Sequence, residues 1–205
     1  MRLGILGGAF NPPHIGHLVC AQEALVQLEL ESVLFVPVGE APHRELEQDP
    51  GAEARVEMCH RAVSRDDRLE LSRIEVDRPG PSYTVDTLRE LRERSPEGEL
   101  VLVLGGDQAA TLPSWRDPDA VLRLATVAAV PRTGWSRERI EVKVASVKGA
   151  QRLVFFDMPR VDVSSSLVRK RAGEGTPIRY LVPDGVADYI FAHGLYGASA
   201  PVGAD

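Results

Sequence analysis

Continuous apolar runs recur along the chain and predict β-strands that are buried on both faces. The runs are rich in branched side chains and cover residues 2–6, 33–38, 100–104, 126–130 and 153–156. Unbroken rather than alternating apolar positions are typical of the strands of a parallel sheet, which helices cover on both sides. The pattern therefore predicts a mainly parallel sheet.

Amphipathic stretches separate these runs and predict helices over residues 17–29, 55–64 and 84–94, where apolar side chains recur at helical spacing. Two further helices are expected near the C-terminus, one after Ser164 and one over residues 184–192. The alternation of strand and helix favours right-handed crossovers. The expected fold class is α/β, a Rossmann-like doubly wound parallel sheet with a short C-terminal helical part. Such folds bind ligands at the carboxyl ends of their strands.

Two segments depart from this alternation. Residues 71–83, LSRIEVDRPGPSY, alternate in polarity and then break at the Pro-Gly-Pro of residues 79–81. This pattern predicts a strand followed by a loop at the edge of the sheet. Residues 41–53 form a long polar loop, and loops of that length are often functional.

Length and composition narrow the class of protein. The 205 residues fit one domain over 1–196, followed by a small and polar tail over 197–205 that we expect to be disordered. A net charge of -6 provides no basic field for nucleic acid. No stretch approaches the roughly 20 apolar residues of a membrane span. The two cysteines, Cys20 and Cys59, lack CxxC spacing, which favours a reducing compartment. We expect a cytoplasmic protein without nucleic-acid or membrane partners.

The candidate chemistry begins in residues 7–18, GGAFNPPHIGHL, at the expected junction of the first strand and the first helix. Gly7 and Gly8 allow backbone amides to approach an anion, and the helix N-terminus adds a favourable dipole. The GxGxxG and GxxxxGK(S/T) phosphate fingerprints are both absent from this loop. His14 and His17, aimed at one point, would donate hydrogen bonds to phosphate oxygens. The alternatives are helix capping and a zinc site, for which the nearby sequence offers no third ligand.

The tetrapeptide His14-Ile15-Gly16-His17 matches the HxGH motif of class I aminoacyl-tRNA synthetases and of small nucleotidyltransferases, both of which activate ATP at its α-phosphate. The chain is short for a synthetase with tRNA-binding domains and contains no KMSKS segment. It resembles the bacterial nicotinate-nucleotide adenylyltransferases over nearly its whole length. Besides residues 7–18, the resemblance is carried by PSYTVDTLREL (81–91), LVLGGDQAATLPSWRD (102–117), VSSSLVRKR (163–171) and RYLVPDGVADYI with its trailing LY (179–196).

This resemblance implies adenylyl transfer from ATP to nicotinate mononucleotide, which yields deamido-NAD and pyrophosphate in NAD biosynthesis. It implies three catalytic residues, His14, His17 and Arg169, and Mg²⁺ that is bound with ATP rather than at a metal site of the protein. The ATP-binding positions that it implies are Gly7, Gly8, Ala9, Phe10, His14, His17, Gly105, Asp107, Ser164, Ser165, Ser166 and Arg169. The positions that it implies for the mononucleotide are Arg44, Ser82, Tyr83, Thr84, Asp107, Trp115 and Arg132.

Several of these positions also allow a structural role. Asp107 would accept hydrogen bonds from ribose hydroxyls or cap the next helix. The amides of residues 82–84 would meet the nicotinate carboxylate, and Thr84 would also serve as a helix N-cap. The resemblance implies that Trp115 stacks on the pyridine ring, with a place in the core as the alternative. The serines at 164–166 open either a phosphate cradle or a capped surface helix.

Three departures from the family pattern affect the candidate site. Ala9 and Asn11 replace the usual Thr and Asp of the first loop, Arg44 replaces a lysine, and Gly106 replaces an alanine. A loop that acts through its backbone amides should tolerate the first two changes, while a forked arginine is placed differently from a lysine on phosphates.

Other functions remain open at this point. The acceptor could be nicotinamide mononucleotide or another phosphorylated compound such as phosphopantetheine. In a different class, the chain could be a nucleotide-binding module that has lost catalysis. The sequence also leaves the oligomeric state open, a homo-oligomer included.

Overall fold

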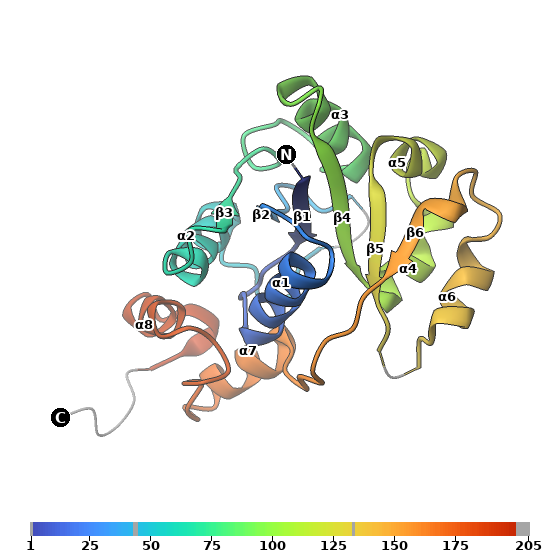
Figure 1. Cartoon of the computed structure of the whole chain (residues 1–205). Helices are drawn as coiled ribbons and strands as arrows, with labels where there is room; N and C mark the ends of the chain where they lie inside the picture. The colour runs from blue at the N-terminus through green and yellow to red at the C-terminus, as the bar shows by residue number, and fades with distance from the viewer. Residues whose placement is uncertain (1, 43–44, 133, 200–205) are drawn as a thin grey trace.

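The computed structural model describes residues 2–42, 45–132 and 134–199. Within them the strands are β1 (Arg2–Gly8), β2 (Ser32–Pro37), β3 (Leu69–Leu71), β4 (Glu99–Gly105), β5 (Thr126–Val130) and β6 (Leu153–Phe155). They form one sheet in the order β3-β2-β1-β4-β5-β6 (Figure 1). Every neighbouring pair is parallel, as the unbroken apolar runs predicted.

Helices cover both faces of this sheet. They are α1 (Ile15–Gln27), α2 (Ala52–Val63), α3 (Thr84–Arg94), α4 (Gly106–Thr111), α5 (Pro118–Leu124), α6 (Arg137–Val144), α7 (Ser165–Gly173) and α8 (Asp184–Ala192). Side chains alternate between the faces along a strand. Ile5 and Leu102 therefore pack in the cluster with α3 to α6, whereas Leu6 and Val103 pack in the cluster with α1 and α2. The prediction of a doubly wound α/β fold is confirmed.

The helices with the clearest apolar periodicity were predicted well. Those expected over 84–94 and 184–192 are present with the same bounds, as α3 and α8, and the helix expected after Ser164 is α7. The short helices α5 and α6 were missed, and α4 was expected only through the possible capping role of Asp107, because six to eight residues carry little periodicity. Their caps were the available signal, since Asp117 and Ser136 each accept a hydrogen bond from the first turn of α5 or α6.

The strand expected within residues 71–83 was wrong in position. β3 ends at Leu71, and the next residues turn instead of continuing the ladder. The reason is local, because the Ser72 hydroxyl accepts the N–H of Ile74 at 3.3 Å, a bond that competes with strand pairing. Ile74 then enters the core from this turn. The edge position was right, since β3 is the first strand of the sheet order.

The C-terminal helices form a third cluster beside α2, away from the sheet (Figure 1). Val168 of α7 and Ile190 of α8 are buried against Met58 and Ala62 of α2. The expected tail over 197–205 is described only as far as residue 199, and its Ala198 is buried in this cluster. No helix among the described residues is long and apolar enough to cross a membrane.

The order of the strands identifies the edge where a ligand would bind. The strands β1, β2 and β3 extend to one side of the sheet and β4, β5 and β6 to the other, so the direction of the crossovers reverses between β1 and β4. A crevice forms at the carboxyl ends of the strands at such a switch point. Gly8 ends β1 and Gly105 ends β4 at this place. The fold therefore brings the two glycine-containing loops together.

Candidate active site

A cavity of about 440 Å³ opens at the carboxyl ends of β1 and β4. Its walls include eleven of the residues expected for ATP or the mononucleotide, namely Gly7, Gly8, Ala9, His17, Ser82, Tyr83, Thr84, Gly105, Asp107, Trp115 and Arg132. These residues come from segments that are up to 125 positions apart, as the separation of Gly7 and Arg132 shows. The structure thus assembles most of the expected site at the switch point of the sheet.

His14 and His17 are held by the backbone of their own loop. His14 is the N-cap of α1, and its Nδ1 accepts the N–H of Gly16 at 3.2 Å. The Nδ1 of His17 accepts the N–H of His14 at 3.1 Å, and the two ring centroids lie 3.8 Å apart. A neutral imidazole carries its hydrogen on the nitrogen that does not accept. Both rings therefore keep Nε2–H as a donor, so helix capping and phosphate binding are compatible roles.

Electrostatics keeps both rings neutral. Burial, with a smaller effect of the Arg132 charge, lowers the pKa of His14 to about 4. Burial, followed by His14 and Arg132, lowers the pKa of His17 well below its ordinary value. Both imidazoles are thus uncharged donors at neutral pH. The Arg132 guanidinium places a positive charge near both rings and also lines the cavity.

The loop after β4 forms another part of the cavity wall, and together with the loop of His14 and His17 we call this part the phosphate end. Gly105 is the N-cap of α4, so the expectation that Asp107 caps this helix was wrong. Asp107 lies in the first turn and lines the cavity, where its carboxylate is available to hydroxyl groups. A Cβ at Gly105 would lie 2.8 Å from the Asp107 carboxylate and 3.7 Å from the Arg132 guanidinium carbon. The glycine therefore leaves room for both charged groups.

The turn before α3 lines the other end of the cavity, which we call the acceptor end. The N–H of Ser82 donates to the carbonyl of Glu40 at 2.8 Å, so this amide is not available to an anion as expected. Tyr83 rather than Thr84 is the N-cap of α3. Thr84 is the first helical residue, and amides of a first turn have no acceptor within their helix. The N–H of Asp86 donates to the Tyr83 carbonyl at 3.0 Å, so the first-turn amides left for a ligand are those of Thr84 and Val85.

Aromatic and cationic side chains complete the acceptor end. Trp115 packs against the core cluster and also lines the cavity, so its core role is confirmed and stacking on the pyridine ring stays a prediction. Its indole N–H donates to the Thr111 hydroxyl at 2.9 Å, which fixes the plane of the ring. The Arg116 guanidinium lies 4.6 Å from the centroid of the Tyr83 ring. Arg116 was not among the expected site residues.

Arg169 and the three serines do not line the cavity but lie against the first loop. The Ser164 hydroxyl caps α7, and the Ser165 hydroxyl donates to the carbonyl of Pro12 at 2.8 Å. Arg169 is buried and donates to the carbonyl of Asn11 at 2.9 Å and to the Glu47 carboxylate at 3.0 Å. Glu47 belongs to the polar loop predicted over 41–53. A phosphate that binds Nη2 of Arg169 would therefore compete with Glu47, while the Nε–H of Arg169 has no hydrogen-bond partner among the described residues.

Two further ATP-binding expectations, Phe10 and His14, are not among the residues that line the cavity. Phe10 is buried, with its ring centroid 5.0 Å from that of His17 and 5.4 Å from that of Phe35, so its side chain supports the histidine from the core. Ser166 lies within 3.4 Å of the Arg169 guanidinium. Arg44 was expected to contact phosphates but lies outside the described residues.

Sequence reasoning missed one residue that shapes the first loop. Arg55 of α2 is buried, and its guanidinium donates to the carbonyls of Ala9, Val38 and Gly39 and pairs with Asp49. An arginine in an amphipathic helix is expected at the surface, so only the three-dimensional structure shows this role. Among residues 2–42, 45–132 and 134–199, no group of three or more His, Cys, Asp or Glu side chains could hold a metal ion.

Comparison with known proteins places the chain in a family. Residues 5–171 match the model of the cytidylyltransferase-like family. A protein of Thermus thermophilus is 43% identical over 196 residues, which is 96% of this chain and 100% of its own length. A protein of Rubrobacter xylanophilus is 40% identical over 201 residues, 98% of this chain and 94% of its own length. Both are named probable nicotinate-nucleotide adenylyltransferases.

Solved structures agree with the fold. The nicotinic acid mononucleotide adenylyltransferase of Plasmodium falciparum, complexed with NaAD, superposes with a TM-score of 0.79 at 18% identity. The match covers 97% of this chain and 98% of the other. The resemblance inferred from the HxGH loop and its companion stretches is thus confirmed. The chain belongs to the cytidylyltransferase-like family and, within it, to the nicotinate-nucleotide adenylyltransferases.

Proposed function

We propose that this protein transfers the adenylyl group of ATP to nicotinate mononucleotide, which gives deamido-NAD and pyrophosphate in the biosynthesis of NAD. The observation that carries the proposal is a single cavity that joins His17 at one end to the first turn of α3 and Trp115 at the other. The names of full-length relatives at about 40% identity support it. The reaction belongs to the cytoplasm, where a reducing environment suits the free thiols of Cys20 and Cys59.

The reaction needs positioning and charge stabilisation more than covalent help from the protein. An oxygen of the 5′-phosphate of the mononucleotide attacks the α-phosphorus of ATP. The bond from that phosphorus to the bridging oxygen then breaks, and pyrophosphate leaves with the electron pair. The Nε2–H groups of His14 and His17 donate to the oxygens on which charge develops, and Arg132 adds a positive charge.

The leaving pyrophosphate would be held by the first turn of α7. Arg169 would bind it once the phosphates replace Glu47, since a phosphate accepts two parallel N–H bonds from a guanidinium. Mg²⁺ would enter as part of the ATP substrate, coordinated by its phosphate oxygens. The oxygen-rich triphosphate suits this cation better than the histidine pair does.

The acceptor end would distinguish the acid from the amide. The amides at the start of α3 are donors only, and they would stabilise the nicotinate carboxylate with the help of the helix dipole. Trp115 would stack on the pyridine ring, and Asp107 would accept hydrogen bonds from ribose hydroxyls. A nicotinamide group presents an NH₂ that these amides cannot use.

Pyrophosphate release from ATP, measured with each acceptor in turn, tests the proposal. We expect turnover with nicotinate mononucleotide and much lower kcat/KM with nicotinamide mononucleotide or phosphopantetheine. Equal rates with the acid and the amide would contradict the role given to α3. Saturable ATP binding without turnover on any acceptor would indicate a binding module instead of an enzyme.

A further inference from the structure

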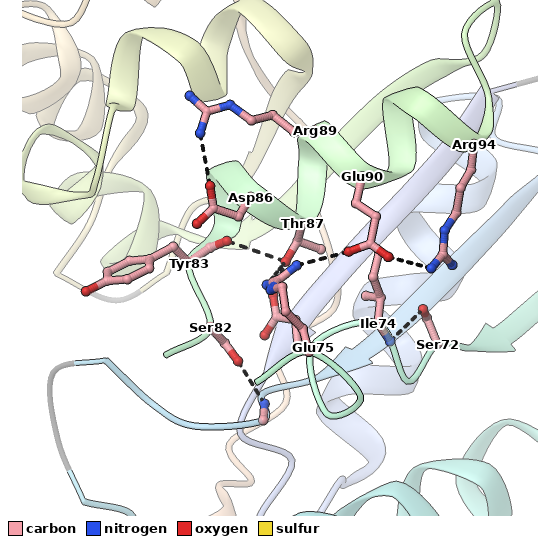
Figure 2. Close-up of polar contacts among 12 residues, drawn as sticks. Ser72, Ile74, Glu75, Ser82, Tyr83, Asp86, Thr87, Arg89, Glu90 and Arg94 are labelled. Atoms are coloured by element: carbon pink, nitrogen blue, oxygen red, sulfur yellow. Dashed lines mark hydrogen bonds and ion pairs between the residues drawn. The ribbon is translucent and has the colours of Figure 1, made fainter. Parts of the chain in front are cut away.

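A buried carboxylate that the reaction does not use lies at the acceptor end of the cavity. Glu75 is 8% exposed and follows β3 in the loop that leads to α3. It lines the cavity together with Ser82 and Thr87. Figure 2 shows its side chain below Thr87 and beside the turn that carries Ser82 and Tyr83. A negative charge here faces the place where an anionic acceptor group would bind, so it needs an explanation.

The Glu75 carboxylate is tied to the first turn of α3 by a directed pair of hydrogen bonds. Arg78 donates to the Thr87 hydroxyl oxygen at 2.9 Å. The hydroxyl has one hydrogen, and this hydrogen is donated to Glu75 Oε1 at 2.7 Å. Arg78, in the loop before α3, also donates to the carboxylate of Glu90 on α3 at 3.3 Å. The carboxylate therefore has a fixed position relative to the N-terminus of α3.

The same turn is attached on its other side to the end of β2. The Ser82 hydroxyl accepts the N–H of Gly39 at 3.1 Å, and Pro81 forms a bridge with Glu40. A Cβ on Gly39 would lie 2.2 Å from the Glu75 carbonyl oxygen, so the loop packs directly on this glycine. Glu75 thus lies between the end of β2 and the start of α3, where it contacts both supports of the turn.

These contacts offset only part of the effect of burial on the pKa of Glu75. Burial raises the pKa of Glu75, while the Thr87 hydroxyl, the Arg78 charge and the Ser82 hydroxyl act in the opposite direction. If Glu75 acted only through its charge, it would repel an anionic acceptor and weaken its binding. Repulsion and positioning therefore predict opposite effects when the charge is removed, which makes the two roles separable by experiment.

We propose that Glu75 is a positioning residue that determines acceptor specificity: by holding Thr87, it orients the first turn of α3 so that the amides of this turn meet the acid group of the acceptor. The inference rests on the proposed function, because it assigns a role in recognising nicotinate mononucleotide. The amides are the groups that touch the substrate, and Glu75 acts through Thr87 and the Ser82 turn. Neither the phosphate end nor ATP binding depends on it.

Steady-state kinetics of Glu75→Gln and Thr87→Val tests this role, with Thr87→Ser as the variant that keeps the hydroxyl. Glu93→Gln is the matched control, because Glu93 is an exposed carboxylate on α3, the helix of Thr87. We expect Thr87→Val to raise the KM for nicotinate mononucleotide about tenfold, as for the loss of a hydrogen bond to a charged group. Glu75→Gln should raise it less, because the amide oxygen of Gln still accepts the Thr87 hydrogen. The KM for ATP should not change, and the preference for acid over amide should fall. Thr87→Ser and Glu93→Gln should behave as the wild type.

Each other result overturns the inference. A lower KM for the acid in Glu75→Gln would show that the carboxylate acts only by repulsion. Parallel rises in both KM values, with the acid preference kept, would show a role in folding only. If Glu75→Gln does not fold, the contrast between Thr87→Val and Thr87→Ser decides the question. Failure of the wild type to use nicotinate mononucleotide would instead refute the proposed function. The wild-type activity is therefore measured before that of any variant.

Discussion

At the phosphate end of the cavity, His14 and His17 are oriented by amides of their own short loop, whereas at the acceptor end the orienting contacts join distant parts of the chain. Both imidazole bonds span three residues or fewer. The bond from Thr87 to Glu75 spans 12 residues, and the bond from Gly39 to Ser82 spans 43. A short motif thus orients the side chains proposed for catalysis, whereas tertiary packing orients the groups proposed for acceptor selectivity.

This contrast predicts that changes at the phosphate end alter kcat and that changes at the acceptor end alter the KM for the mononucleotide. Arg169 is an exception at the phosphate end, since it reaches the first loop from 158 residues away and is paired with Glu47 in this structure. The largest expected effect comes from the histidines, and the smallest from the pH dependence of stability.

Replacing His17 with Ala should reduce kcat by about 10²–10³, the usual cost of removing one donor that stabilises transition-state charge. The KM for nicotinate mononucleotide should change little, because His17 lies at the other end of the cavity. Pyrophosphate release under saturating substrates measures kcat. His193→Ala, at the exposed end of α8, is the control. Near-normal turnover in His17→Ala would contradict the catalytic assignment.

Replacing Trp115 with Ala should raise the KM for nicotinate mononucleotide about tenfold, since stacking of a base on an aromatic side chain contributes roughly 1–3 kcal/mol. The KM for ATP should stay the same. Trp115→Phe keeps an aromatic face and should recover most of the affinity. A comparable rise in the KM for ATP would mean that Trp115 supports the whole cavity rather than the acceptor.

Replacing Glu47 with Gln should lower the KM for ATP by about two- to fivefold, because an exposed ion pair contributes less than roughly 1 kcal/mol. The Glu47 side chain is 84% exposed, so its pairing with Arg169 is weak and easily replaced by phosphate. Glu45→Gln, an exposed carboxylate in the same loop, is the control. An unchanged or higher KM for ATP would show that Glu47 does not compete with phosphate.

Thermal unfolding between pH 6.5 and 4 should show the cost of burying neutral imidazoles. The pKa of His14 is about 4 in the folded chain, and that of His17 is also lowered. The unfolded chain therefore binds more protons in this range, and stability is full above pH 6.5 and decreases as the pH falls. His14→Gln should have a smaller decrease in Tm than the wild type. An equal decrease in both proteins would contradict the burial of a neutral His14.

The features that could be predicted from the sequence are those that depend on neighbouring residues, and the features that could not are those that depend on distant ones. The apolar runs predict the parallel sheet, and the HxGH motif locates the histidine pair, because both depend on neighbouring residues. Glu75, Arg55 and Glu47 could not be predicted. Their roles depend on which carbonyl, hydroxyl or guanidinium another segment places beside them. Glu75 does lie between the apolar Ile74 and Val76, which is a weak sign of its burial.

The most direct measurement of the central claim is a competition assay that identifies the dinucleotide product. Wild-type protein would receive ATP, Mg²⁺ and equal concentrations of nicotinate and nicotinamide mononucleotides, and mass spectrometry would quantify the two dinucleotides. The account predicts that deamido-NAD is by far the major product and that His17→Ala loses it. A majority of the amide dinucleotide, or neither product, would contradict the account.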